Sequence, residues 1–432
     1  MAWRLGLVAA ILLCGSAAFA GEESATQLRI VTDRPDGVYV AGEAATFAFE
    51  LTDGGRPVPA APLRCELSTD GFRTSEARTV EVVDGRAEVT AGRDVPCVLC
   101  VRATWERDGE PAVRATGGAA FSPERIEPSM PPPDDFDAFW RAQVARLADV
   151  PMNAVVEPLE SPTDRADVWN VRLDSVGGQH VYGYLARPKG EGPFPALVCF
   201  RSAGVAPISK EWAAGRAHWQ GPMLVFSINA HSILNEQPPE YYRQMGEGPL
   251  RGYPHQGRDS RETSYFLGMY LRCVRAVEFV ASHPDWDGKH LIVYGSSQGG
   301  GQALVAGGLC PQVSAVCACV PAMCDHTAPV SPHHAAGWPR LVSVDRASGV
   351  ADPAQLEAAR YFDAVNFARR ITAPTLVGAG LLDLTCPASS VCAACNVMTC
   401  PKQVTLDPLT GHAAGPGWQK ASQEFIPREM TR

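Results

Sequence analysis

The chain has 432 residues, of which 46% are hydrophobic, and it carries a formal net charge of −9. This length is enough for two or three domains with buried cores. The acidic balance, and the lack of any dense lysine and arginine cluster, argue against nucleic acid or an anionic membrane as the main partner.

The first twenty residues, MAWRLGLVAAILLCGSAAFA, predict a secretory signal peptide. Arg4 supplies the positive charge, Leu5 to Leu13 form the apolar segment, and AFA is the small-x-small cleavage pattern. A lipoprotein anchor on Cys14 is the alternative, although the bulky Leu13 in front of it fits that signal poorly. No segment is long and apolar enough to span a bilayer. We therefore expect a secreted or periplasmic protein with no membrane span.

Residues 21–122 predict a small all-β accessory domain. Segments such as LRIVTD and RTVEVVDGRAEVTAG alternate apolar and polar residues and are separated by turn sequences. Strands at this spacing predict an immunoglobulin-like antiparallel sandwich. A packing or spacing role is favoured over carbohydrate binding, for which no specific signal is present. The proline-rich stretch FSPERIEPSMPPPDDF then predicts a linker at the start of a second domain, residues 123–432.

The second domain has the pattern of an α/β fold. Helices are predicted at about Asp135 to Leu147, at Ser264 to Ser282 and from about Trp418. Between them lie apolar strand-like segments, at 195–200, 223–228, 291–294, 313–320, 374–380 and 402–407. Apolar strands alternating with helices indicate a mostly parallel sheet covered on both faces.

The segment LIVYGSSQGGGQAL contains the motif G-x-S-x-G, in which Ser297 is the central serine. The motif lies between a predicted strand and a predicted helix, where it forms a tight turn that projects the serine hydroxyl above the sheet. The helix N-terminus places backbone N–H groups near any developing negative charge. This context favours Ser297 as a nucleophile over a mere turn residue.

A serine nucleophile needs a base and a carboxylate that orients the base, and in α/β-hydrolases the chain order is serine, acid, histidine. Asp383 directly follows the strand that ends at Gly380, so it is the preferred acid, with Asp407 as the reserve. His412 follows the last strand in a glycine-rich loop and is the one histidine beyond Asp383. We therefore predict a triad of Ser297, Asp383 and His412, with no metal and no cofactor.

The second domain contains three blocks with a wider likeness: YFLGMYLRCVRAVEFVASHPDWDGKHLIVYGSSQGGGQAL, AARYFDAVNFARRITAPTLVGAGLLDLTCPASSVCAACN and FPALVCF. Through these blocks the domain resembles the acetyl xylan esterase and cephalosporin-C deacetylase family, carbohydrate esterase family 7, of the α/β-hydrolase superfamily. The likeness covers roughly residues 131–425 and leaves the β domain unexplained. It implies the same triad, an oxyanion hole from the backbone N–H groups of Gln298 and Ala203, and a homo-oligomer, since members often form hexamers.

The chain departs from the family pattern near the expected substrate mouth. Arg201-Ser202-Ala203 replaces the usual His-Gly-Tyr, Asn229-Ala230-His231 replaces Arg-Gly-Gln, and Ala413 replaces a glutamate. Arg201 and His231 are therefore candidate substrate-binding residues for a carboxylate or a sugar hydroxyl, against an ordinary role in positioning loops. Trp212, Trp219 and Trp338 are candidates for stacking on sugars, against ordinary core packing.

Cysteines do not form a convincing metal site. Removing Cys14 from the 14 cysteines leaves 13, an odd number. Cys97 and Cys100, and the group Cys392, Cys395 and Cys400, are closely spaced, but neither has the paired clusters of a zinc site. Buried structural thiols are the favoured interpretation, and which of them pair is left open.

The leading functional hypothesis is a secreted serine esterase that removes acetyl groups from an acylated polysaccharide. The alternatives keep the triad and change the bond: an esterase for other acyl or uronate esters, or a peptidase of the prolyl-oligopeptidase kind. A carbohydrate-binding protein on an inactive hydrolase scaffold is disfavoured, because all three catalytic residue types occur in the required order.

Overall fold

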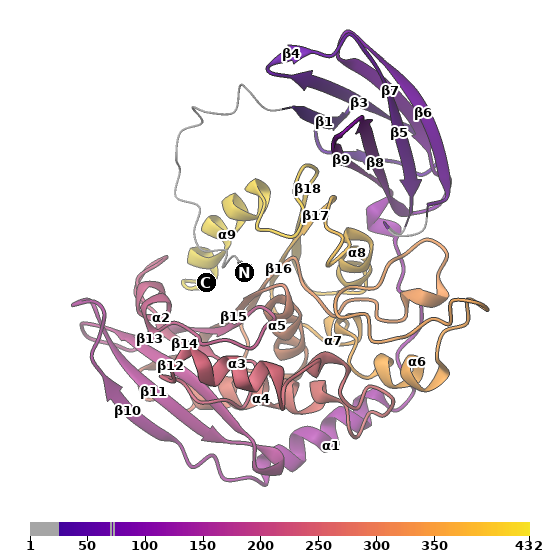
Figure 1. Cartoon of the computed structure of the whole chain (residues 1–432). Helices are drawn as coiled ribbons and strands as arrows, with labels where there is room; N and C mark the ends of the chain where they lie inside the picture. Colours follow the sequence, from indigo (N-terminus) through magenta and orange to yellow (C-terminus); the bar gives the residue numbers. More distant parts are fainter. Residues whose placement is uncertain (1–25, 70, 72–73) are drawn as a thin grey trace, which may run out of the picture.

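The computed structural model describes residues 26–69, 71 and 74–432, so the predicted signal peptide lies outside the described residues. Two sheets dominate the chain (Figure 1), and an all-β domain precedes an α/β domain, as predicted. Within the described ranges, no helix has the length and apolar character needed to cross a bilayer.

The N-terminal domain is one curled, mostly antiparallel sheet in the order β1-β3-β7-β6-β5-β8-β9-β2. Alternating side chains of these strands point inward and form a core that includes Phe47, Phe49, Leu63 and Phe121. The strands are β1 (Gln27–Thr32), β2 (Val38–Tyr39), β3 (Ala44–Asp53), β4 (Arg56–Pro57), β5 (Ala60–Ser68), β6 (Glu76–Val83), β7 (Arg86–Gly92), β8 (Cys97–Arg107) and β9 (Glu110–Phe121).

The second sheet has the order β10-β11-β12-β14-β13-β15-β16-β17-β18. The six strands β14, β13, β15, β16, β17 and β18 pair in parallel, in this order. The strands β10, β11 and β12 form an antiparallel edge next to β14. The strands are β10 (Val155–Leu159), β11 (Ala166–Asp174), β12 (His180–Pro188), β13 (Phe194–Phe200), β14 (Leu224–Ile228), β15 (Trp286–Ser296), β16 (Ala315–Cys319), β17 (Thr375–Gly380) and β18 (Lys402–Asp407).

Helices cover both faces of this sheet, because the central strands are apolar on both sides. One core lies under α1, α4, α5, α7 and α8, and the other lies under α2 and α9. The helices are α1 (Phe136–Ala148), α2 (Lys210–Arg216), α3 (Pro239–Glu247), α4 (Tyr265–Ala281), α5 (Gln298–Leu309), α6 (Pro353–Arg360), α7 (Ala364–Ala368), α8 (Ala388–Asn396) and α9 (Pro416–Glu429).

The proline-rich segment between β9 and α1 is held by side chains of the α/β domain. The Ser129 backbone N–H and hydroxyl donate to the two carboxylate oxygens of Asp325, at 3.0 and 2.8 Å. The Asn396 amide donates to the backbone oxygens of Pro123 and Ile126, at 2.7 and 2.9 Å. These bonds fix the path of the segment although its prolines supply no N–H donors.

The β domain also packs against the loop that follows β17, which we call the acid loop, residues 381–386 (Figure 1). A Cβ atom added at Gly118 of β9 would lie only 2.7 Å from the backbone oxygen of Leu381. One added at Gly37 would lie 3.0 Å from the Leu381 side chain, and one at Gly71 would lie 2.6 Å from that of Leu384. Three glycines therefore allow the β domain to approach this loop closely.

Candidate active site

Ser297 lies at the sharp turn between β15 and α5. Its backbone has φ 59° and ψ −123°, a strained conformation for a residue other than glycine. Glycines on both sides make the turn possible, because a Cβ at Gly295 would lie 2.1 Å from the oxygen of Gly299, and one at Gly299 would lie 2.2 Å from the oxygen of Phe200. The side chain at the centre of this turn projects beyond the ends of the parallel strands.

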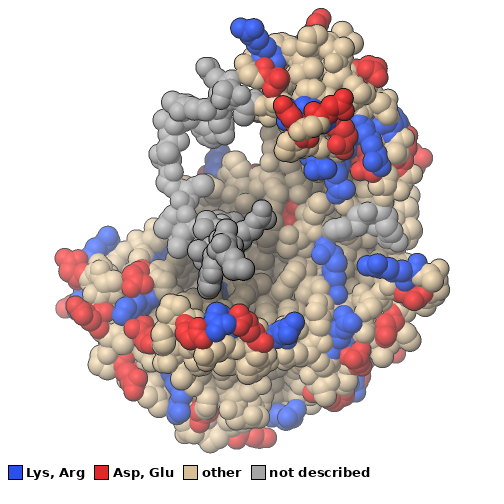
Figure 2. All heavy atoms as spheres, viewed as in Figure 1, with Lys and Arg blue, Asp and Glu red and all other residues tan. Residues whose placement is uncertain are grey.

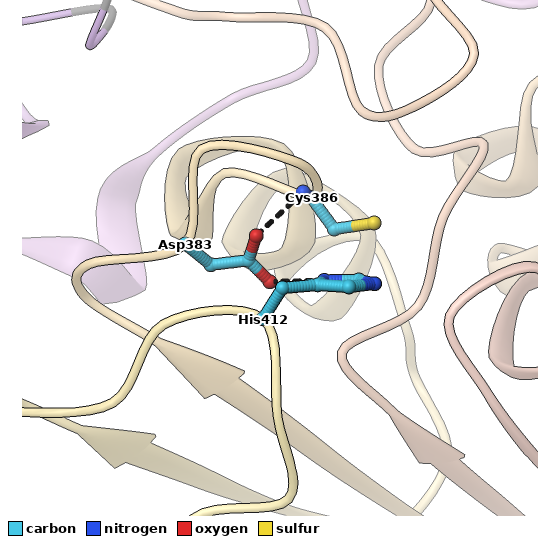
Figure 3. Close-up of side chains that lie close together, drawn as sticks. All are labelled: Asp383, Cys386 and His412. Atoms are coloured by element: carbon cyan, nitrogen blue, oxygen red, sulfur yellow. Dashed lines mark hydrogen bonds and ion pairs between the residues drawn. The ribbon is translucent and has the colours of Figure 1, made fainter. Parts of the chain in front are cut away.

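The three predicted side chains form one hydrogen-bonded chain. Nε2 of His412 lies 2.8 Å from Oγ of Ser297, and Nδ1 of His412 lies 2.8 Å from Oδ2 of Asp383. Figure 3 shows the Asp383 carboxylate pointing at the imidazole of His412. The other carboxylate oxygen accepts the backbone N–H groups of Thr385 and Cys386, both at 2.8 Å. Because Asp383 is only 2% exposed, these bonds replace the water that an ionised carboxylate needs.

Asp407, the reserve acid, is engaged elsewhere. Its carboxylate accepts the backbone N–H groups of Gly417 and Trp418, at 2.7 and 3.4 Å, at the start of α9. This is the helix-capping role expected of a carboxylate at a helix N-terminus. The structure therefore brings Asp383, and not Asp407, to His412.

The two predicted oxyanion donors come from segments that are held together. Gln298 is the first residue of α5, and Ala203 lies in the loop after β13. The hydroxyl of Ser202 donates to the backbone oxygen of Ser296 at 3.0 Å, which connects that loop to the turn at Ser297. The hydroxyl of Tyr253 donates to Oε1 of Gln298 at 2.5 Å and holds this side chain in the protein interior.

Arg201 is partly exposed and bonded to its own loop. Its guanidinium donates to the backbone oxygens of Ala206, at 2.7 Å, and Pro207. Burial lowers the pKa of this guanidinium from its usual value. Arg201 thus holds the shape of the loop that contains Ala203. It also lines a cavity whose wall includes Trp212.

His231 does not lie at the mouth of the site, where the sequence placed it. The side chain is fully buried, and its Nδ1 lies 2.6 Å from the hydroxyl of Tyr265. Its backbone N–H bonds to Oδ1 of Asn229 at 3.1 Å, so the chain turns inward after β14. Burial lowers the pKa of this imidazole to about 3, which keeps it neutral. The physical reason for the difference is that Tyr253 and Tyr265 pack around the ring.

One group of possible metal ligands occurs among the described residues, and two of its members, Asp383 and His412, belong to the predicted triad. The ligand atoms of Asp383, Cys386 and His412 lie within 4.8 Å of one another (Figure 3). Burial raises the pKa of the Cys386 thiol well above its usual value, which disfavours the thiolate that a metal ion binds. The carboxylate and the imidazole are already bonded to each other, so we interpret the thiol as part of the wall of the site. Cys392, Cys395 and Cys400 are likewise buried.

Sequence patterns did not reveal Tyr253 or Cys386 as parts of the site. Tyr253 begins a three-residue 3-10 helix between α3 and α4, which is too short for a periodic pattern to indicate which side chains face Ser297. Cys386 lies in the motif that carries Asp383, and its spacing from the acid was the available signal. Figure 2, viewed as in Figure 1, shows a surface that is hollowed in the middle, with most of the charged side chains in view around the margin of the hollow.

Comparisons with known proteins agree on the family. The family model for acetyl xylan esterase (AXE1) matches residues 124–428. The chain is 30% identical over 386 residues to acetyl esterase Axe7A of Xylanibacter ruminicola, covering 88% of this chain and 86% of that protein.

Two solved structures give the same fold. Acetyl xylan esterase from Paenibacillus sp. R4 is 28% identical, with a TM-score of 0.60, covering 71% of this chain and 98% of that one. Acetyl xylan esterase 1 from Thermoanaerobacterium sp. JW/SL YS485 also has a TM-score of 0.60, at 21% identity, covering 71% of this chain and 97% of that one. The chain is a carboxylesterase of the α/β-hydrolase fold, and it belongs to the acetyl xylan esterase family.

Proposed function

We propose that this protein is an exported serine esterase that removes acetyl groups from an acylated polysaccharide of the xylan type. The observation that carries the proposal is the unbroken hydrogen-bonded chain from Ser297 through His412 to Asp383, at 2.8 Å for each step. Export rests on the signal-like pattern of residues 1–20.

In the proposed first step, Oγ of Ser297 attacks the carbonyl carbon of the acetyl ester while its proton moves to Nε2 of His412. Asp383 holds Nδ1–H of the imidazole and stabilises the imidazolium that forms. The tetrahedral intermediate then breaks its bond to the sugar oxygen, which takes the proton from Nε2 and leaves as an alcohol. An acetyl group remains on Ser297.

In the second step, His412 accepts a proton from water, and the resulting hydroxide attacks the acetyl carbonyl. Collapse of this intermediate returns the proton to Oγ of Ser297 and releases acetate. The backbone N–H groups of Gln298 and Ala203 are proposed to stabilise both oxyanions, a contribution of about 3–4 kcal/mol per donor in comparable sites. Backbone donors tolerate the replacement of the family tyrosine by Ala203.

We propose Arg201 as a contact at the edge of the site for a sugar hydroxyl or a carboxylate. Its partial exposure supports this role, whereas its two bonds to loop carbonyls favour a positioning role as well. His231 is not carried into the proposal, because a fully buried ring does not reach a substrate.

An acetate-release assay tests the function. Purified protein is incubated with acetylated xylan, with a methyl-uronate ester and with a prolyl peptide substrate, and the release of acetate, of methanol and of the amine is measured for each in turn. We expect cleavage of the acetylated xylan alone. The Ser297→Ala variant should lose nearly all turnover with its melting temperature retained, whereas the control variant Ser348→Ala, at an exposed loop serine, should keep it. Preferred cleavage of the uronate ester or of the peptide would overturn the proposal.

A further inference from the structure

A cavity of about 460 Å³ lies directly beside the nucleophile turn, on the α2 side of the sheet. Its walls include Ser296, which precedes Ser297, and Ser202, which precedes Ala203. Trp212, Arg216 and Tyr294 also line the cavity. The volume falls in the range of about 300–1,000 Å³ that is usual for small-molecule sites.

Arg216 is held in this wall by aromatic rings. Its guanidinium carbon lies 3.5 Å from the ring centre of Trp219, 4.7 Å from that of Trp212 and 5.6 Å from that of Tyr294. Its Nη1 atom is buried and has no hydrogen-bond partner in the part of the chain that the structure describes. A buried guanidinium nitrogen without an acceptor is costly unless a ligand supplies one.

Two cationic side chains, Arg201 and Arg216, line the cavity. Among the described residues that form its wall, none is an aspartate or a glutamate. The bonds of Arg201 are to backbone carbonyls, which do not neutralise its charge. In a chain with a net charge of −9, this local excess of positive charge fits an anionic ligand.

We propose that this cavity is a subsite for a uronate residue, the carboxylate-bearing branch of an acidic acetylated xylan. The inference rests on the proposed function and specifies its substrate class. The guanidinium fork of Arg216 matches a carboxylate, and Trp212, which is 37% exposed, offers a ring face on which a sugar packs. A branch bound here places a neighbouring acetyl group at Ser297. Free acetate has the same carboxylate but would leave most of the volume unfilled.

A binding measurement separates the subsite from catalysis. The Ser297→Ala protein is titrated calorimetrically with an unacetylated xylo-oligosaccharide that carries one glucuronate branch, and with the unbranched oligosaccharide. We expect the branched ligand to bind at least about tenfold more tightly, and Arg216→Gln to remove that difference, as expected for the loss of a charge-assisted hydrogen bond. Arg141→Gln on α1, an exposed arginine outside the cavity, is the matched control and should change nothing.

Steady-state kinetics on enzyme that retains Ser297 give a second test of the subsite. Arg216→Gln should raise KM at least about tenfold for the acetylated branched oligosaccharide, with KM for the unbranched one and turnover of a small acetyl ester unchanged. Arg216→Lys, which keeps the charge and loses the fork, should fall between them. Acetate should compete no better with the wild type than with Arg216→Gln.

Equal binding of the two oligosaccharides, or an equal loss on both substrates in Arg216→Gln, would overturn the subsite. Inhibition by acetate that depends on Arg216 and matches that by the branched ligand would assign the cavity to the product instead. If the wild type releases no acetate from either substrate while Arg216-dependent binding persists, the proposed function fails and the carboxylate site stands.

Discussion

Replacement of Gly118 by alanine should lower the kcat of the α/β domain, although Gly118 itself lies in the β domain. The new Cβ would lie 2.7 Å from the backbone oxygen of Leu381 and 2.9 Å from its Cβ, two residues before Asp383. Ordinary contact begins at about 3.4 Å, so the acid loop must move by roughly 0.7 Å or β9 must yield. Because a 1 Å displacement in an active site can cost about a hundredfold in rate, we expect kcat to fall about tenfold to a hundredfold.

The matched control is Gly92→Ala, whose Cβ would lie 2.7 Å from the backbone oxygen of Glu43, within the β domain and not at the acid loop. Both variants should unfold at a lower temperature, which is followed by circular dichroism. Only Gly118→Ala should lower kcat for acetate release, with KM nearly unchanged, because the nucleophile and the walls of the site are intact. Equal kcat in the two variants would refute the reasoning that the β domain positions the catalytic acid.

Three further predictions concern single side chains. Asp383→Asn should lower kcat by about ten-thousandfold with the fold retained, because the amide no longer stabilises the imidazolium of His412. Steady-state kinetics measure this loss. A loss below tenfold would contradict the proposed role of Asp383 as the acid. Tyr253→Phe removes the 2.5 Å bond from the tyrosine hydroxyl to Gln298. It should raise the activation free energy by about 1 kcal/mol, which is a roughly fivefold lower kcat/KM for acetate release. An unchanged kcat/KM would contradict the idea that Tyr253 positions Gln298 as an oxyanion donor.

The third is the pH dependence of stability. His326 is fully buried, and neither ring nitrogen has a hydrogen-bond partner among the described residues. Burial lowers the pKa of this imidazole to about 3. Below about pH 6.5 the unfolded state therefore binds a proton at this histidine that the folded state does not bind. The contribution of His326 to the free energy of unfolding is full above that pH and is lost as the pH falls toward 3. Between pH 7.5 and 5 this histidine accounts for about 2 kcal/mol of unfolding free energy. Urea unfolding should show that loss, and His326→Phe should lack it; an identical loss in both proteins would contradict the account.

The parallel sheet and the convergence of Ser297, His412 and Asp383 were predictable from the sequence, because both depend on local patterns in a known chain order. The strand at Lys402–Asp407 was placed correctly to the residue, and Asp383 was preferred over Asp407 from its position just after a strand. The motif around Ser297 fixed the turn because glycine is required at both flanking positions by contacts of 2.1 and 2.2 Å.

Long-range contacts were not predictable in this way. His231 was expected at the mouth because it follows a strand, but the rings that bury it come from the segment before α4 and from its first residue, Tyr265. The approach of Gly118 to Leu381 joins residues of two domains and leaves no periodic signal. The cage around Arg216 depends on how α2 lies over β15, which composition does not specify.

The most direct test of the central claim is covalent labelling with a phosphonate ester probe that reacts only with an activated serine, located by peptide mass spectrometry. Wild-type protein should carry the label on Ser297 in parallel with loss of acetate release, and His412→Ala should remain unlabelled although Ser297 is still present. A label on another serine, or full labelling without His412, would contradict the claim that residues 297, 412 and 383 act as one proton-transfer chain.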